Sequence, residues 1–528
     1  MGLSSVLSTA ISGLNINQSG LGIVSRNIAN ADTPGYTRKV LVQENQLTGG
    51  VGAGVRQADV VRDVNRFIID QLREARTQAA GSSVTSEFLT RLDQLYGKPG
   101  SDAALDTIVN GLGNDLEQLA ADPQSDINRQ TVLAGADTLA RKLNSLSHGI
   151  QAMRLDAERG ISTVVTDINT TLESLAQVNQ TLRGRGASPE GASGLLDRRD
   201  QLLGSLADLI DIRVITDEDG AVRVFTGTGD LLVDHEAASL SFDERQNVNA
   251  QTLYSDDDTL RGVGTVTLHS RGGNTTNLLL GNATRGGQLG AYVELRDDTL
   301  VQAQGQLDEL AHALALSFSD KENTGTAVSV GGSDGVDLDV DGLLAGNAIT
   351  VSYVENGTAR TVSFVKVDDA ATLPLSNDVT ADPDDRVVGI DFSGGFAAAV
   401  ADMNAALGAG VSITSPAAGR LRILDDGAAG TTDITSASAR ITSTAISDDG
   451  PQVALFRDTG GRAYSAGLDG GAQKLGFAER ITLNSALAAD PSGLVIYSTS
   501  PLTDAGDQTR PIELAARLKE RSFTFSAQ

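Results

Sequence analysis

The chain has 528 residues, 40% of them hydrophobic and only 4% aromatic, and its 68 acidic and 41 basic residues give a formal net charge of −27. A surface this acidic repels phosphate backbones and anionic lipids, so neither nucleic acid nor a membrane is expected as a partner. Cysteine is absent, which excludes disulfides, thiolate nucleophiles and cysteine-ligated metals, and the length exceeds that of one compact core.

Residues 3–29 follow a seven-residue apolar repeat, which is the pattern of a coiled-coil helix. The candidate subunit-contact residues are the apolar members of its two seam positions: Leu3, Leu7, Ala10, Leu14, Leu21, Val24 and Ile28. Gly13, Gly20 and Gly22 lie in the same stretch, and each weakens a helix by about 1 kcal/mol. We therefore expect a helix that needs partners; an ordinary core helix of a globular domain is the alternative.

A turn is predicted where this helix ends, because Pro34 biases Thr33 away from helical angles and Pro34-Gly35 suits a turn. Residues 40–60 are expected to be extended, with glycines at 49, 50, 52 and 54 as interruptions. No basic residue precedes Arg26, so the pattern of a cleavable secretory signal is missing. Export, if it occurs, is expected to leave the N-terminus uncleaved.

From about 62 to 210 the apolar spacing is helical. Asp122 followed by Pro123 predicts the N-cap and first turn of a helix that runs to about 183. Gly184, Gly186 and Pro189 are predicted to end it, and a shorter helix follows through Leu209.

The apolar period then changes to two. Residues 212–225, with Asp219-Gly220 between the apolar runs, predict a hairpin, and further strands are expected at 264–269 and 277–280. Helical spacing returns at 290–319.

Residues 325–470 are rich in Gly, Asp, Ser, Thr and Val, and Asn356-Gly357 between two apolar runs predicts a hairpin. A short helix at 396–407 and strands near Val411 and Leu421 complete the expectation of an inserted β-rich domain. Beyond it, residues 481–487 and 512–518 have helical character.

No motif predicts catalysis, a metal or a cofactor. Residues 331–335 match G-x-S-x-G, but a strand rather than a helix is expected after Ser333, so a loop is the better interpretation. Asp337, Asp339 and Asp341 resemble the start of a calcium loop, yet the twelfth position is Ala348, and one face of an exposed strand explains the alternation better.

Residues 26–38 resemble the signature shared by flagellar rod, hook and hook-associated proteins. The residues that carry this resemblance are Asn27, Ile28, Ala29, Asn30, Thr33, Pro34, Gly35 and Tyr36. Residues 54–67, 194–203 and 290–300, the last with Arg296-Asp297, resemble the first hook-associated protein family. The resemblance covers roughly 1–320 and a patch near 479–515.

The resemblance implies a structural adaptor at the hook–filament junction of the bacterial flagellum. Its implied partners are like subunits in a ring, the hook protein, the second junction protein and an export chaperone. The family is exported through the flagellar type III apparatus and is extracellular. Another axial protein, of the hook or rod, and a secreted β-rich adhesin or binding protein are the alternatives.

The expected fold class is therefore multidomain α+β. Residues 1–60 form an N-terminal axial segment, 61–324 a helical domain with a β subregion at about 211–285, 325–470 the inserted β-rich outer domain, and 471–528 the return to the helical domain. The family pairs its N-terminal helix with a C-terminal one, and no such helix is expected in the stretch that ends at Phe523–Gln528.

Overall fold

The computed structural model describes residues 3–48, 51–184, 189–280, 286–380 and 382–520, so the predictions for Gly49, Gly50, Gly186 and Phe523–Gln528 lie outside the described residues. The chain folds into two compact units. One contains residues 1–91, 152–248 and 252–300, and the other contains 92–151, 249–251 and 301–528. Of the described helices, none is long and apolar enough to cross a membrane.

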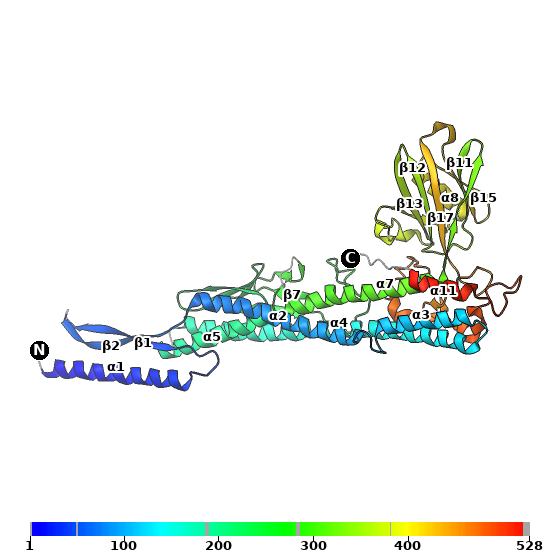
Figure 1. Cartoon of the computed structure of the whole chain (residues 1–528). Helices are drawn as coiled ribbons and strands as arrows, with labels where there is room; N and C mark the ends of the chain where they lie inside the picture. Colours follow the sequence, from blue (N-terminus) through cyan, green and yellow to red (C-terminus); the bar gives the residue numbers. More distant parts are fainter. Residues whose placement is uncertain (1–2, 49–50, 185–188, 281–285, 381, 521–528) are drawn as a thin grey trace. The chain divides into compact units, whose positions relative to one another are not determined.

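The first unit contains α1, the hairpin β1–β2, two sheets with strand orders β3-β4-β5 and β6-β7-β8, and parts of two long helices (Figure 1). Its element bounds are α1 Leu3–Ala29, β1 Lys39–Thr48, β2 Val51–Arg62, α2 Arg66–Tyr96, α4 Asp126–Arg183, α5 Pro189–Leu209, β3 Ile212–Thr216, β4 Val222–Thr226, β5 Leu231–Val233, β6 Ser239–Phe242, β7 Val266–His269, β8 Thr275–Asn277 and α6 Gly287–Glu294. The helices and sheets are those of a multidomain α+β fold, as predicted.

Apolar side chains of α4, α5 and both sheets enclose one core in this unit. Ile161, Ile168 and Leu175, which follow the helical apolar spacing predicted for this segment, are fully buried there, together with Leu206 and Val224. α4 ends at Arg183 and a shorter helix, α5, follows to Leu209, as predicted; Pro189, predicted as a helix breaker, is the first residue of α5. The hairpin at Asp219-Gly220 is also confirmed, whereas the strand expected at 277–280 is wrong, because β8 ends at Asn277.

A buried ion pair joins α4 to the turn after α6. The guanidinium of Arg296 lies on the Glu158 carboxylate at 2.6 Å and on Asp297 at 2.7 Å, and the side chains of Arg296 and Glu158 are fully buried. Glu158 also accepts from the backbone N–H groups of Arg245 and Gly264. Arg296 lies in a π turn, Leu295–Thr299, so the helix predicted at 290–319 begins at Gly287 and is interrupted before α7 (Leu300–Ser319).

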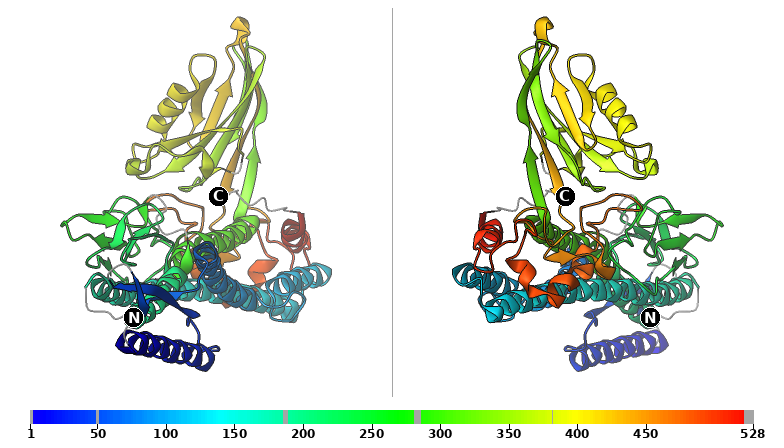
Figure 2. Two further views of the ribbon diagram at one scale, coloured as in Figure 1. Left: turned by 90° about the vertical axis from the view of Figure 1, so that its left-hand side faces the viewer. Right: turned by 90° about the vertical axis from the view of Figure 1, so that its right-hand side faces the viewer.

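The second unit contains a two-sheet sandwich and a helical part. Its further elements are α3 Leu105–Ala121, β9 Asp320–Thr324, β10 Thr326–Val330, β11 Ser333–Asp339, β12 Ala348–Glu355, β13 Thr358–Val367, β14 Arg386–Asp391, α8 Phe396–Leu407, β15 Ser412–Ala417, β16 Arg420–Leu424, β17 Thr432–Thr442, β18 Phe456–Arg457, α9 Phe477–Arg480, β19 Thr482–Leu483, α10 Ser485–Ala489 and α11 Thr509–Glu520. The sheets β14-β13-β12-β17-β9 and β10-β11-β16-β15 and α8 share one core (Figure 2).

The sandwich begins earlier and ends earlier than the β-rich segment expected at 325–470. β9 starts at Asp320, whose buried carboxylate accepts from Thr442 Oγ1 at 2.7 Å, and β17 ends at Thr442. Residues beyond it pack elsewhere: the Phe456 ring lies 6.0 Å from the Phe318 ring of α7, and Tyr464 stacks on Phe477 at 3.7 Å. The Asn356-Gly357 hairpin and the helix at 396–407 are confirmed.

Two helix predictions in this unit are wrong. Asp122 does not open the helix after it, because its backbone N–H still bonds to Gln118 O and makes it the C-cap of α3. α4 starts at Asp126, where Ser125 Oγ accepts from the backbone N–H of Asn128. The segment 481–487 is a short strand followed by a short helix, because Thr482–Leu483 pairs with β18.

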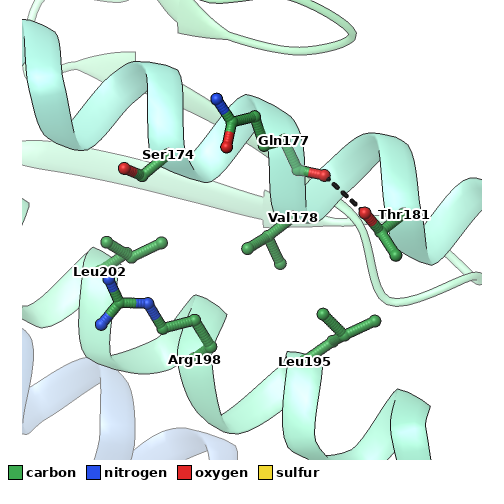
Figure 3. A pocket seen from close by; sticks show the side chains of 7 residues that line it. All are labelled: Ser174, Gln177, Val178, Thr181, Leu195, Arg198 and Leu202. Carbon is green, nitrogen blue, oxygen red and sulfur yellow. Dashed lines mark hydrogen bonds between the residues drawn. The ribbon is translucent and has the colours of Figure 1, made fainter.

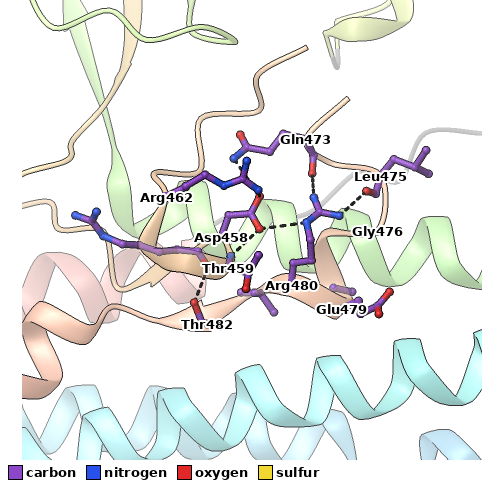
Figure 4. A network of polar contacts seen from close by, with 12 residues as sticks. Asp458, Thr459, Arg462, Gln473, Leu475, Gly476, Glu479, Arg480 and Thr482 are labelled. Carbon is purple, nitrogen blue, oxygen red and sulfur yellow. Dashed lines mark hydrogen bonds and ion pairs between the residues drawn. The ribbon is translucent and has the colours of Figure 1, made fainter. Parts of the chain in front are cut away.

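A polar network fixes the loops before α9 (Figure 4). The buried carboxylate of Asp458 accepts from Arg480 Nε at 3.1 Å and from the backbone N–H of Thr459 at 2.7 Å. Arg480 also donates to the carbonyl oxygens of Gln473 and Leu475. One ion pair therefore joins both ends of the 458–480 segment, which contains little regular structure.

The Arg296→Met substitution tests the buried ion pair. It leaves the Glu158 carboxylate buried without its ion-pair partner, which is expected to lower the free energy of unfolding by about 3 kcal/mol. The double variant Glu158→Gln/Arg296→Met is expected to recover part of that loss.

The matched control is Arg91→Met, because Arg91 pairs with Asp156 of the same α4 through side chains that are 39% and 40% exposed. That substitution is expected to cost about 1 kcal/mol or less. Denaturant unfolding of the full chain measures all three, and equal losses for Arg296→Met and Arg91→Met would contradict the prediction.

Candidate assembly surface

α1 rests on the β1–β2 hairpin through one narrow face (Figure 1). Ile16 and Ile23 are 6% and 3% exposed on this face, and Ser12 Oγ accepts from the backbone N–H of Val55 at 3.2 Å. A Cβ at Gly20 would stand 3.8 Å from the Leu41 side chain. Gly20 therefore belongs to the packed face, although glycine weakens the helix itself.

The predicted seam lies on the opposite side of α1 and is exposed. The exposed fractions are 61% for Leu7, 59% for Leu14, 68% for Leu21, 52% for Val24 and 73% for Ile28. Ala10 is exposed as well, and the side chain of Leu3 lies outside the described residues. A row of apolar side chains on one helix face is the arrangement that packs against another helix.

Two residues of the motif, Asn27 and Tyr36, form the hydrogen bonds that join the C-terminal end of α1 to β1. Asn27 Nδ2 donates to Lys39 O at 2.9 Å, and Asn27 Oδ1 accepts from Lys39 N at 3.0 Å and from the Tyr36 hydroxyl at 2.9 Å. Burial and the nearby Asp197 carboxylate raise the pKa of Tyr36 above its usual value, so the hydroxyl stays protonated and donates. The side-chain amide of Asn27 therefore pairs with both backbone groups of Lys39, as a residue of a neighbouring strand would.

The same loop is joined to α5 by a group of charges, which we name the Asp197 cluster: Thr37, Lys39, Arg62, Asp197 and Asp200. Asp197 lies 2.9 Å from Arg62 Nε and 3.3 Å from Lys39 Nζ, and it accepts from Thr37 Oγ1 at 2.5 Å. Arg62 reaches Asp200 at 2.5 Å, and its side chain is only 5% exposed. Removing one partner of an ion pair shielded in this way costs more than breaking a surface pair, because the remaining charge is held away from water.

Gly35 allows the loop to approach α5. Its φ is +79°, in the left-handed region that suits glycine, and Gln201 Nε2 donates to Pro34 O at 2.9 Å. A Cβ at Gly35 would collide with the Gln201 side chain. Of the other motif residues, Asn30 donates to Arg26 O and Thr33 bonds to Asn30, while Ile28 and Ala29 face solvent.

The structure thus brings together three stretches that the sequence separates: residues 26–38, 54–67 and 194–203. Sequence reasoning identified each stretch by resemblance but did not assign a role to Arg62, Asp197 or Asp200. The charged residues in the three stretches were the feature of the sequence that could have indicated ion pairs. Their separation along the chain gives no indication of which residues pair.

The other motifs form no site among the described residues. Ser333 begins β11 after a turn at Gly331 and Gly332, and no helix follows it. Asp337 and Asp339 face Arg422 and Arg420 of the neighbouring strand, so their carboxylates are paired, and the strand expected there is confirmed. Within the described chain, no three carboxylate or imidazole groups come together as metal ligands.

Comparisons with known proteins agree with this arrangement. The family described as flagellar hook-associated protein FlgK helical domain matches residues 89–338, and the family described as flagella basal body rod protein matches residues 7–37. The second match covers most of α1 and most of the loop that follows it.

Full-length relatives give the same result. Flagellar hook-associated protein 1 of Escherichia coli is 26% identical over 335 residues, which are 61% of this chain and 58% of the relative. The protein of the same name from Salmonella typhimurium is 28% identical over 377 residues, 69% of this chain and 65% of the relative. The chain therefore spans less than two thirds of the length of these relatives.

A solved structure, that of the flagellar hook junction protein FlgK from Burkholderia pseudomallei, matches 71% of this chain and 62% of its own at 19% identity, with a TM-score of 0.40. The sequence matches indicate first a class, since both matching families are flagellar axial proteins. Within that class, the chain is similar to flagellar hook-associated protein 1 through the helical-domain match at residues 89–338 and the two relatives of that name.

The substitution Gly35→Ala tests the packing of the motif loop on α5. It adds a Cβ where Gln201 stands and strains a positive φ, so it is expected to destabilise the first unit by about 2 kcal/mol or more and to loosen α1. Gly100→Ala is the matched control, because Gly100 has φ +77° and a Cβ added there would have no atom within 4 Å.

The control carries the backbone strain alone and is expected to cost about 1 kcal/mol. Thermal unfolding and limited proteolysis near residue 35 measure both variants. Equal effects would show that the contact with Gln201 contributes nothing.

Proposed function

We propose that the chain is a structural component of the bacterial flagellum, an adaptor at the hook–filament junction that assembles by packing α1 against neighbouring subunits. The observation that carries the proposal is the two-sided character of α1. Ile16 and Ile23 are buried on the chain's own hairpin, whereas Leu14, Leu21 and Ile28 are 59–73% exposed on the other side.

The magnitudes favour several neighbours over one. Complete burial of an aliphatic side chain contributes about 1.5–3 kcal/mol, so covering the exposed parts of five such residues contributes on the order of 5–10 kcal/mol. Association costs roughly 4–15 kcal/mol in lost freedom of motion. One such contact is therefore marginal. In a closed ring, each subunit has a neighbour on both sides, so two contacts rather than one hold it in place.

The candidate contact residues are those of the seam: Leu3, Leu7, Ala10, Leu14, Leu21, Val24 and Ile28. Like subunits in the ring are the first partners, and the hook protein, the second junction protein and an export chaperone are the others. Within the flagellum, we expect the protein to lie outside the cell. Its role is mechanical, and it is not an enzyme.

Similarity to the hook-associated family favours the junction over the rod or the hook. The rod-protein family matches only residues 7–37, which axial proteins share, whereas the hook-associated helical domain matches residues 89–338. The sandwich of the second unit lies largely beyond that match. We propose that it is an outward-facing domain.

The Leu14→Asp substitution tests this proposal. A carboxylate in the middle of the seam opposes burial against a neighbour but faces solvent in the isolated chain, because Leu14 is 59% exposed. The variant is expected to keep the circular dichroism spectrum and unfolding temperature of the parent and to abolish swimming and incorporation into flagella.

Asn15→Asp is the matched control, since Asn15 is exposed on the flank of the same helix and gains the same charge. It is expected to swim normally. Ile16→Asp, on the buried face, is expected instead to destabilise the isolated chain. Normal swimming and filaments with Leu14→Asp would refute the seam as the assembly surface.

A further inference from the structure

A pocket between α4 and α5 in the first unit is left open by the chain itself (Figure 3). Its volume is about 260 Å³, well above the roughly 30 Å³ of one water molecule in the liquid, so it has room for an aliphatic side chain. Val178, Leu195 and Leu202 form its apolar part. Thr181 and Arg198 line it with polar groups.

Arg198 differs from its neighbours in the sequence. Asp197 and Asp200 bind Arg62, and Arg199 binds Asp200 and the carbonyl oxygen of Gly220. Arg198 is exposed and has no hydrogen-bond or ion-pair partner in the described part of the chain. The pocket therefore combines a small apolar patch with polar groups, which also include Ser174 and Gln177, and with the uncompensated positive charge of Arg198.

A complementary projection exists on the same unit, in the loop of residues 253–262, which we name the Leu260 loop. Leu260 is 73% exposed, and Asp256, Asp257 and Asp258 precede it. Such a loop presents one apolar side chain beside the carboxylates of Asp256 and Asp257, whose charge is opposite to that of Arg198, whereas the Asp258 carboxylate lies 2.6 Å from Arg261 of the same loop.

The Leu260 loop is held in shape before any contact. Gly262 N donates to Leu253 O at 2.9 Å and closes the loop. Asp257 Oδ1 accepts from the side chain and the backbone N–H of Thr259, and these bonds keep the pKa of Asp257 below its usual range. Little conformational entropy remains to be lost on docking, which favours binding.

The loop and the pocket of one subunit cannot meet each other. The loop is flanked by Thr252 and Gly264, which bond to Arg154 and Glu158 of α4, whereas Val178 lies at the pocket. Twenty residues of helix separate Glu158 from Val178, roughly 30 Å at 1.5 Å per residue. The two surfaces can therefore combine only between different molecules.

We propose that Leu260 of one copy of this chain inserts into the α4–α5 pocket of the next copy, with the carboxylates of its loop near Arg198. The inference rests on the proposed function, because it names a contact by which subunits of the ring adjoin. Two different surfaces meet, so the contact is head-to-tail, and such contacts repeat and close into rings. The chain's net charge of −27 makes a second copy a suitable source of carboxylates for a free arginine.

Disulfide cross-linking tests this contact cleanly, since the chain contains no cysteine. Leu260→Cys combined with Thr181→Cys places one thiol on the loop and one at the pocket, and cysteine is itself a small apolar side chain. Mild oxidation of isolated flagella, and of the concentrated purified protein, is expected to yield a ladder of dimers, trimers and longer oligomers. Leu260→Cys alone can give only dimers.

The matched control pairs Leu260→Cys with Thr163→Cys, an exposed position on α4 outside the pocket, and is expected to give no ladder. Arg198→Asp in the Leu260→Cys/Thr181→Cys variant is expected to reduce the cross-linked fraction about fivefold or more. Adding Asp258→Arg is expected to restore part of it.

The outcomes separate this inference from the proposed function. Protein that is present in flagella but gives no ladder in either preparation overturns the contact and leaves the function standing. A ladder from purified protein that never enters flagella supports the contact and overturns the function. An adduct with a different protein in place of the ladder overturns the second copy as the occupant.

Discussion

The ion pairs of Arg62 with Asp197 and Asp200 are the interaction on which the placement of the N-terminal segment depends. These side chains are 5%, 10% and 17% exposed, and loss of Arg62 would remove the one cation that both of these largely buried carboxylates share. The apolar contact of α1 with its hairpin is small by comparison, because among the described side chains of α1 only Ile16 and Ile23 are buried. Polar contacts of fixed geometry therefore hold a helix that packs weakly.

The polar and the apolar contacts of α1 have different roles because only the polar contacts are directional. A hydrophobic contact is non-directional, whereas the paired bonds of Asn27 with Lys39 and the fork of Arg62 fix one orientation. With α1 held by its polar end and one narrow face, the seam from Leu7 to Ile28 stays free. A subunit that must reach its place before it assembles gains from keeping its apolar contact surface in one rigid, defined position.

The elements that the sequence predicted well are those governed by local chemistry. Asn356-Gly357 favours a tight hairpin by itself, and Gly184 with Pro189 separates two helices wherever they pack. The heptad of α1 predicted both the helix and its exposed seam. It could not show that the second apolar pair, Ile16 and Ile23, is the one the hairpin covers, since both stripes repeat every seven residues.

The failures concern residues whose structure is decided far away along the chain. β9 has the polar sequence Asp-Lys-Glu-Asn-Thr, which strands disfavour, and it is a strand because β17 pairs with it. Asp197 lies 160 residues from Thr37, and Arg296 lies 138 from Glu158, so no spacing rule connects them. The pocket between α4 and α5 also depends on residues far apart in the sequence, and so does the lack of a partner for Arg198 among the described residues. Spacing along the chain therefore predicted neither of them.

The most direct test of the account is the accessibility of the seam before and after assembly. Ala10→Cys places the only thiol of the chain on the seam with little change in size, and Ala10 is exposed in the isolated chain. A maleimide is expected to label this thiol rapidly in the purified protein and to be excluded in isolated flagella, while a thiol at Thr163 reacts in the purified protein at a similar rate. Equal labelling of Ala10→Cys in both states would contradict the burial of α1 between neighbouring subunits.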